Sequence, residues 1–386
     1  MACEPAPEPP AAPAATATRT LEAHCLCQAV RFLVTVPSAA LPLPVHMCHC
    51  SICRTTHGTF SCFHTELPAG VRPVGLDGGD VADRATGYAH ARAAAVRYFC
   101  TTCGTHIGDE DLPGSNGSGG PLLWRIATSL FTPGLHDDDN DAAPGQAFAL
   151  RSHVLTDSAP AGFYRWLPRL GDGGHELFVW NPAPGHPMFA MASEPNEPTA
   201  PARDLATGRR VLRVACHCGG VHFELTQPGD DDGDDNDIDE PDLSAPLLDG
   251  WLDLSDDSRL ANGAHVIGWA ALPRARAAPL LGLINSREAD TALARYSLHG
   301  TTRGFCRTCG ATVYAADDDD DDDDDNNSDS NTTFRLAVGL LRAPEGVTAQ
   351  RWVRWRTDRI DGFAEGERYH AGFARGLRDG LAAWSG

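Results

Sequence analysis

The chain has 386 residues, of which 42% are apolar, and a formal charge of −21 from 31 Lys and Arg against 52 Asp and Glu. At roughly 150 residues per domain, this length predicts two or three domains. The acidic balance argues against nucleic acid as a partner, because phosphate binding requires a basic surface. No stretch approaches the ~18 uninterrupted apolar residues of a membrane helix, and the N-terminal segment lacks the basic and apolar regions of a signal peptide. We therefore expect a soluble, cytoplasmic protein in a reducing compartment without a membrane partner, in an oligomeric state that the sequence leaves open.

After a predicted disordered tail at 1–19, the chain is predicted to be mainly β, built from short strands. Residues 29–36 alternate between apolar and polar, as a half-buried strand does, and 122–130, 148–155 and 333–341 show similar patterns. A helical pattern is confined to the C-terminal tail at 369–386. There one apolar stripe recurs every four residues and is expected to pack against a domain, while three interspersed glycines weaken the helix. The stripe is Tyr369, Phe373, Leu377 and Leu381.

Four blocks of sequence occur twice in the same order. The pair Cys25-x-Cys27 corresponds to Cys216-x-Cys218, and Cys100-x-x-Cys103-Gly corresponds to Cys306-x-x-Cys309-Gly. The blocks that begin at Trp124 and Thr156 recur at Phe334 and Thr357. We therefore predict two tandem domains, at 20–168 and 211–368, joined by a linker at 169–210 that is rich in Pro, Gly and Ala.

Most of the negative charge lies in three runs, at 137–141, 230–242 and 317–329, so the rest of the chain is nearly neutral. Such runs cannot bury enough apolar surface to become ordered. We predict that they are solvated insertions, at 229–242 and 317–330 in the second domain. The alternative, a docking site for a basic partner, has no support elsewhere in the sequence.

Thirteen cysteines in an intracellular protein are more often metal ligands than disulfides. The second domain has only the two flanking pairs, so each set of four forms a self-sufficient unit. Four thiolates are typical of a closed structural zinc site, and the glycine after each Cys-x-x-Cys allows a tight turn at the metal. We expect two structural zinc sites, and the alternative is that these are free buried cysteines. The ligands are Cys25, Cys27, Cys100 and Cys103 in the first domain, and Cys216, Cys218, Cys306 and Cys309 in the second.

The first domain has a further cluster, Cys48-x-Cys50-x-x-Cys53, to which we assign no fourth cysteine, leaving Cys3 and Cys62 without a role. Three thiolates leave either an open position, as in a catalytic zinc site, or a place for a histidine. His46, His49 and His57 are near enough in sequence to close the site, which would make it structural. A redox-active pair is disfavoured because the βαβ context is missing. In the second domain we expect the segment around Ala271 and Arg274 to occupy this place, with His265 as the nearest possible ligand.

The charge of the triad favours thiol chemistry. Three thiolates and Zn²⁺ sum to −1, which makes the metal a weak acidifier of water. A soft, sulfur-rich centre is better suited to accept another thiol and hold it as a thiolate. We therefore expect a thiol substrate rather than hydrolysis.

The order of these motifs resembles the glutathione-dependent formaldehyde-activating enzyme and centromere protein V family. The likeness is close over the first domain, including Arg54 and Gly58 beside the triad, and partial over the second, and the whole chain resembles fungal-type proteins with two such domains. The resemblance implies a mainly β, tent-like fold of small antiparallel sheets in each domain, stapled by zinc. It also implies a structural zinc at Cys25, Cys27, Cys100 and Cys103. The same resemblance implies a catalytic zinc at Cys48, Cys50 and Cys53, where glutathione and formaldehyde condense to S-hydroxymethylglutathione.

Two features depart from the family pattern. The second domain lacks the triad, so we expect a single active site. Thr55 stands where many members have a basic residue. The function predicted is therefore a carbon–sulfur lyase or synthase acting on a glutathione–aldehyde adduct. The alternative is a zinc-stapled binding module without chemistry, and a thiol-exchange or metallochaperone role is a third.

Overall fold

The computed structural model describes residues 17–114, 120–132, 136–137, 146–171, 173–183, 202–204, 208–227, 248–287, 291–318 and 333–384. The mainly β fold and the short C-terminal helix are confirmed. Residues 1–16, nearly all of the acidic runs and much of the predicted linker lie outside the described residues. The first strand begins at Thr18, so the last two residues of the segment predicted as a tail belong to a strand.

The N-terminal half, residues 17–183, contains two sheets. The smaller is antiparallel and has the order β1-β2-β5, and strand β2 buries Val34 and Val36 on one face, as the alternation predicted. The larger has the order β10-β11-β3-β4-β9-β8-β7-β6, with β12 beside β11. The strands are β1 Thr18–His24, β2 Arg31–Pro37, β3 Leu43–Cys48, β4 Cys62–Glu66, β5 Val74–Gly75, β6 Thr86–Tyr88, β7 Ala95–Phe99, β8 His106–Asp111, β9 Trp124–Ala127, β10 His136–Asp137, β11 Phe148–Val154 and β12 Phe178–Trp180.

The C-terminal half, residues 202–384, also contains two sheets. In the smaller, β14 pairs with β13, β15 and β22, and the larger has the order β18-β19-β20-β21-β17-β16-β23. The strands are β13 Ala202–Arg203, β14 Arg210–Ala215, β15 His222–Thr226, β16 Leu248–Asp253, β17 Ile267–Pro273, β18 Leu293–Leu298, β19 Thr301–Cys306, β20 Thr312–Asp317, β21 Thr333–Ala337, β22 Leu341–Arg342 and β23 Val353–Asp361.

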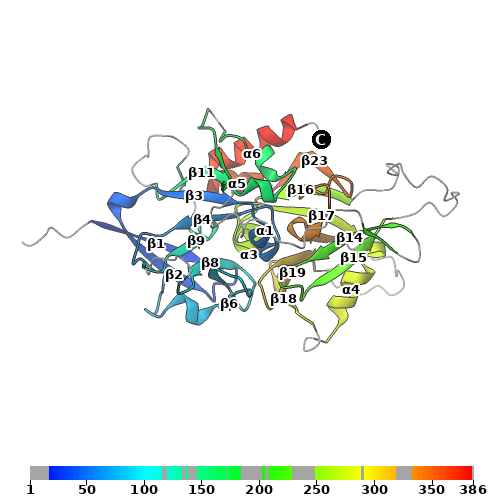
Figure 1. Ribbon diagram of the computed structural model, residues 1–386, viewed down its shortest axis with the longest axis horizontal. Coiled ribbons are helices and arrows are strands. Elements are labelled where there is room, and N and C mark those ends of the chain that lie inside the picture. Colours follow the sequence, from blue (N-terminus) through cyan, green and yellow to red (C-terminus); the bar gives the residue numbers. More distant parts are fainter. Residues whose placement is uncertain are drawn as a thin grey trace, which may run out of the picture.

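The two large sheets share one topology. From β11 to β6 and from β23 to β18, the first pair of strands is parallel and every following pair is antiparallel. Helix α1 (Ser51–His57) connects β3 to β4, and α3 (Asp256–Asn262) connects β16 to β17 in the same way. The halves lie side by side with α1 and α3 between them (Figure 1). The division into two homologous domains remains a prediction, which this shared topology supports.

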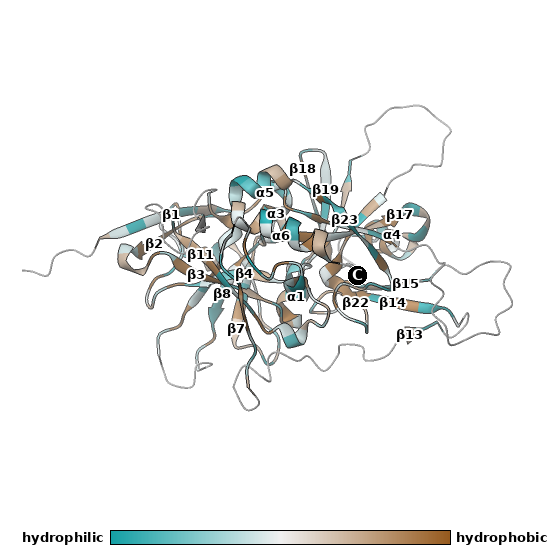
Figure 2. Cartoon of the chain, turned by 90° about the horizontal axis from the view of Figure 1, so that it is seen from above, coloured by the Kyte–Doolittle hydropathy of each residue, from teal (hydrophilic) through white to brown (hydrophobic). Residues whose placement is uncertain are grey.

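One hydrophobic core extends through both halves, because each short helix packs against the other half. Helix α1 contacts the turn Val338–Leu340, and α3 contacts Thr128–Leu130. A Cβ added to Gly58 at the end of α1 would lie 2.2 Å from the carbonyl oxygen of Thr312. Seen from above, the apolar strands of the two halves lie on either side of the junction that α1 and α3 form between the halves (Figure 2).

The C-terminal helices cover the N-terminal half. Helix α4 (Ala278–Asn285) lies near β15, while α5 (Phe363–Tyr369) and α6 (Ala371–Ala383) bury the four residues of the predicted stripe. Glycines in α6 permit close contact as well as weakening the helix: a Cβ on Gly380 would overlap the backbone oxygen of Trp166. The chain from 166 to 171 therefore runs directly against α6.

Candidate functional site

The predicted four-cysteine set of the N-terminal half is assembled in the structure. Cys25 and Cys27 follow β1, Cys100 and Cys103 follow β7, and all four sulfurs lie within 4.8 Å of one another. The Sγ atoms of Cys25 and Cys27 are 3.5 Å apart, close to the about 3.8 Å edge of a tetrahedron with Zn–S bonds of about 2.3 Å. Gly104 has a φ of +79°, which explains the glycine in the motif. The donor set fits zinc.

The C-terminal half contains a matching set. Cys216 and Cys218 follow β14, Cys306 ends β19 and Cys309 follows it, and their sulfurs also lie within 4.8 Å of one another. The Cys218 and Cys306 Sγ atoms are 3.5 Å apart, and Gly310 has a φ of +77°. The sequence therefore grouped both sets correctly, and both could hold zinc.

The third cluster contains a thiol that the sequence analysis left out. Cys62 lies directly opposite Cys48 in the β3–β4 ladder, and their sulfurs form a group with Cys53 in which every pair is within 4.8 Å. Cys50 caps the N-terminus of α1, and its Sγ accepts a hydrogen bond from the Cys53 amide at 3.4 Å. Cys48 and Cys53 interact with each other, and each also interacts with Cys50 and Cys62. Hydrogen bonds from Cys48, Cys50 and Cys62 hold the pKa of Cys53 well below its usual value. The expectation of a triad with no fourth cysteine is wrong.

None of the three candidate histidines joins the thiol cluster. His49 is fully buried, and its Nε2 is hydrogen-bonded to His153 Nδ1 at 2.9 Å. His57 stacks on His106 with ring centres 4.0 Å apart, and its Nδ1 faces the Cys53 carbonyl. His46 lies on the same strand face as Cys48, where its Nδ1 is hydrogen-bonded to Ser152 Oγ at 2.8 Å, and burial lowers its pKa. Among the described residues, the group that joins the three predicted cysteines is therefore the thiol of Cys62 and not a histidine.

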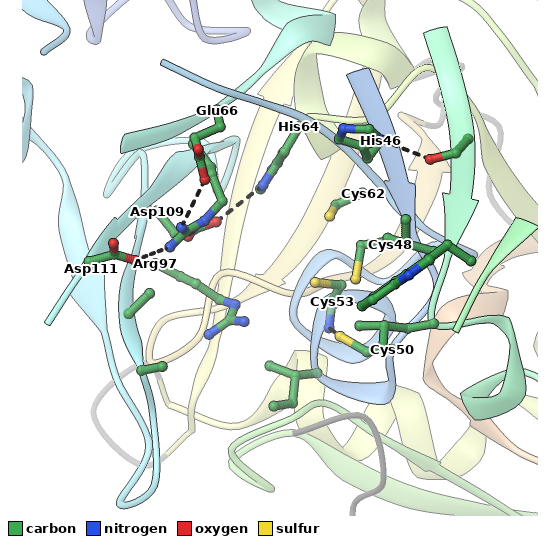
Figure 3. Close-up of a pocket in the computed structure, with 18 of the residues that line it drawn as sticks. His46, Cys48, Cys50, Cys53, Cys62, His64, Glu66, Arg97, Asp109 and Asp111 are labelled. Carbon is green, nitrogen blue, oxygen red and sulfur yellow. Dashed lines mark hydrogen bonds and ion pairs between the residues drawn. The ribbon is translucent and has the colours of Figure 1, made fainter. Parts of the chain in front are cut away.

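All four thiols open onto a cavity of about 650 Å³ (Figure 3). Its walls come from β3, β4, β7, β8, β9, β11 and β12 of the N-terminal half. Phe178 and Trp180 line it from β12, which lies in the segment predicted to be linker. The linker prediction missed this strand because the surrounding residues are rich in Pro and Gly.

One wall of the cavity is charged. Arg125 binds Asp109 through Nε at 2.6 Å and Asp111 through a terminal nitrogen at 2.7 Å. His64 donates from Nδ1 to the second oxygen of Asp109 at 3.2 Å. Burial alone would raise the pKa of Asp109, but Arg125, His64 and Arg97 together outweigh burial and lower it to about 2. Asp109 is therefore ionised, with both carboxylate oxygens engaged.

A second arginine faces the thiols. Arg97 comes from β7, lines the cavity and lies on the side of Cys53 in Figure 3. Burial would lower its pKa, but the neighbouring Cys53 and Asp109 raise it, so it remains a cation. Thr55, where a basic residue was expected, is fully buried and donates to the Ser51 carbonyl. The basic group of this site thus comes from a different element.

The corresponding place in the C-terminal half has no thiol. The register of β16 with β17 places Asp253 opposite Ile267, as Cys48 lies opposite Cys62, so Asp253, Ser255 and Ser258 occupy the positions of the triad. The expected segment around Ala271 and Arg274 is therefore wrong by 16 residues, the distance from Ser255 to Ala271. Asp253 accepts hydrogen bonds from Ser258 Oγ at 2.7 Å and Trp269 Nε1 at 3.0 Å.

His265 is not part of that place. It stacks on Phe63 of the other half, with ring centres 4.3 Å apart, and its Nε2 is hydrogen-bonded to Thr128 Oγ1 at 3.1 Å. Its contacts belong to the junction between the halves rather than to a metal site.

Comparison with known proteins agrees with the motifs. Residues 20–122, from β1 to the start of β9, match the family described as glutathione-dependent formaldehyde-activating enzyme. This segment contains all four thiols of the cavity and the first four-cysteine set. No curated protein and no solved structure matches the chain. Among the described residues, no helix has the length and apolar character needed to cross a membrane.

Proposed function

We propose that the N-terminal half is a zinc-dependent carbon–sulfur lyase or synthase that interconverts glutathione and formaldehyde with S-hydroxymethylglutathione. The observation that carries the proposal is the opening of four thiols onto a cavity of about 650 Å³ within the segment that matches the family. The cavity is large enough for a peptide-sized thiol. We assign the two four-cysteine sets, one in each half, to structural zinc. The proposal also includes the division of the chain into two homologous domains at 20–168 and 211–368.

Zinc at the cavity would be held by Cys48, Cys53 and one further thiol. That third ligand would be Cys50 from the start of α1 or Cys62 from β4. Bound there, zinc supplies a soft Lewis acid that favours a thiolate over a thiol. In the synthetic direction the substrate thiol loses its proton, sulfur bonds to the carbonyl carbon, and the carbonyl oxygen gains a proton. The lyase direction reverses these changes.

His46 is placed to handle the proton of the substrate thiol. It is two residues from Cys48 on the same face of β3 and lines the cavity. Burial lowers its pKa, so the imidazole is neutral at neutral pH and can accept a proton. Phe178 and Trp180 shield this side of the cavity with apolar surface.

A binding module without chemistry is the second candidate, and Cys62 is the observation that favours it. If Cys48, Cys50, Cys53 and Cys62 all hold one zinc, the site is closed and the metal is structural. The two candidates therefore differ in one property, which is whether a thiol from solution can reach the metal.

The direct test is turnover together with metal content. The proposal predicts three zinc ions per chain by elemental analysis, and formation of S-hydroxymethylglutathione from glutathione and formaldehyde faster than without protein. Three zinc ions without turnover would favour the binding module. One zinc ion or fewer in folded protein would contradict the assignment of the cysteine sets.

A further inference from the structure

Arg97 is a cation at the cavity that lies near the thiols but binds no carboxylate of the described chain. Among the described residues its guanidinium makes no hydrogen bond and no ion pair, whereas Arg125 on the same wall binds two carboxylates. A guanidinium held in a partly desolvated site without a partner is unfavourable, and a carboxylate is the group that its planar fork binds best.

The nearest acid on the neighbouring strand cannot serve Arg97. Asp109 lies directly opposite Arg97 in the β7–β8 ladder. Its two oxygens are already taken by Arg125 at 2.6 Å and by His64 at 3.2 Å. Arg97 therefore lines the cavity without a bound carboxylate.

The C-terminal half shows the same arginine with its acid in place. Arg303 on β19 corresponds to Arg97 on β7, since each stands three residues before the first cysteine of the Cys-x-x-Cys pair. Arg303 is 7% exposed and lies 3.6 Å from Asp257 on α3. The residue at the position of Asp257 on α1 is Ile52, which carries no charge and lines the cavity. The N-terminal half has kept the cation and has an apolar residue where the acid would be.

We propose that Arg97 is a carboxylate-binding subsite beside the thiols, and that it makes the site specific for thiols that carry a carboxylate. The inference rests on the proposed function, because it assumes that a thiol is bound at Cys48 and Cys53. The other charges of this wall are paired with one another: Glu66, Asp109 and Asp111 all lie within ion-pair distance of Arg125, which leaves Arg97 as the cation for an incoming carboxylate. A neutral thiol gains nothing from Arg97.

The test compares two thiols of equal length on the zinc-loaded full chain, 3-mercaptopropionate and the neutral 3-mercaptopropan-1-ol, with formaldehyde as co-substrate. We expect kcat/KM to favour the acid by about tenfold or more, as one charge-assisted contact provides. Arg97→Gln is expected to remove the preference by raising KM for the acid alone, and Arg97→Lys to retain part of it. An equal loss for both thiols would show that Arg97 only balances the charge of the thiolates and would overturn the subsite.

A second pair of variants tests the same idea without removing the arginine. Ile52→Asp supplies the acid that the C-terminal half has at Asp257 and is expected to abolish the preference, whereas Ile52→Asn is expected to preserve it. A retained preference in folded Ile52→Asp protein would contradict the proposal.

Calorimetric binding of the two thiols without formaldehyde separates this inference from the proposed function. Binding of the acid that depends on Arg97, without turnover of either thiol, supports the subsite and contradicts the enzyme. Turnover of both thiols with equal efficiency supports the enzyme and contradicts the subsite.

Discussion

The same strand–helix–strand unit lines a cavity in the N-terminal half and is filled by buried side chains in the C-terminal half. In the N-terminal half the cross-strand pair His46 and His64 borders a cavity, and the next pair on the same face of the strands is Cys48 and Cys62. In the C-terminal half the corresponding pairs are Trp251 with Trp269 and Asp253 with Ile267. Both indoles are buried, so they occupy the space that is open in the other half.

This difference shows how one backbone supports either a site or a core. Large aromatic side chains gain stability by removing apolar area from water, at roughly 25 cal/mol per Å². Histidines and thiols at the same positions forgo that gain and leave polar groups around a cavity. The hydrogen bonds of Asp253 with Ser258 and Trp269 then satisfy polar groups where the other half has sulfur.

The largest expected effect concerns what the halves share, the four-cysteine sets. Cys103→Ser and Cys309→Ser are each expected to destabilise the fold severely, because binding of a structural zinc contributes folding free energy on the order of 10 kcal/mol. Since one core runs through both halves, either variant is expected to lower the melting of the whole chain. Unchanged melting of either variant in a thermal scan would contradict the assignment of that set.

Turnover is expected to depend on only one of the two strand–helix–strand units. Cys53→Ser is expected to abolish turnover with little change in melting temperature, because the C-terminal half folds with Ser258 at this position. The matched change, Ser258→Ala, is expected to leave turnover intact and cost about 1 kcal/mol through the lost hydrogen bond to Asp253. If Cys53→Ser retained some turnover and the additional change Ser258→Ala removed it, the active site would lie in the C-terminal half, and this account would be wrong.

The hydrogen bonds that replace the thiols can be tested through Asp253. Asp253→Ala leaves Ser258 Oγ and Trp269 Nε1 without their acceptor, and we expect a loss of about 3 kcal/mol in the free energy of unfolding. Denaturant unfolding measures this loss. Wild-type stability in Asp253→Ala would mean that this place is held by packing alone.

Acid is expected to act on the N-terminal half through His153. Burial lowers the pKa of His153 to about 4, whereas the corresponding residue in the C-terminal half is Ile360. Its neutral form is the folded form, so stability is full above the unfolded pKa of about 6.5 and is lost as the pH falls toward 4. We expect His153 to contribute about 2 kcal/mol to the loss at pH 5, and a shallower pH dependence for His153→Gln. Equal slopes for both proteins in unfolding titrations would contradict this account.

Much of this architecture could be predicted from periodicity and spacing. The alternation of 29–36 identified β2, the stripe from Tyr369 to Leu381 identified the C-terminal packing, and spacing alone grouped both four-cysteine sets. These signals are local or repeated, so they do not require knowledge of the sheet order.

What the sequence could not reveal depends on register between distant strands. Cys62 is nine residues from Cys53 and has no motif of its own, yet pairing of β3 with β4 places it opposite Cys48. Arg97 reaches the cavity from a strand near the other end of the same sheet. The counterpart of the triad was misplaced because Asp253, Ser255 and Ser258 share no residue type with it.

Whether the cavity cluster accepts a thiol from solution, while the other two cysteine sets are closed, is the central question. It can be measured on cobalt-substituted full-length protein titrated with glutathione. The account predicts that the thiolate-to-cobalt charge-transfer band grows by the contribution of one thiolate per chain, with release of a proton. It also predicts that this growth is absent in Cys53→Ser. An unchanged spectrum in protein that holds three cobalt ions would show that Cys62 closes the site and that the chain is a zinc-stapled binding module.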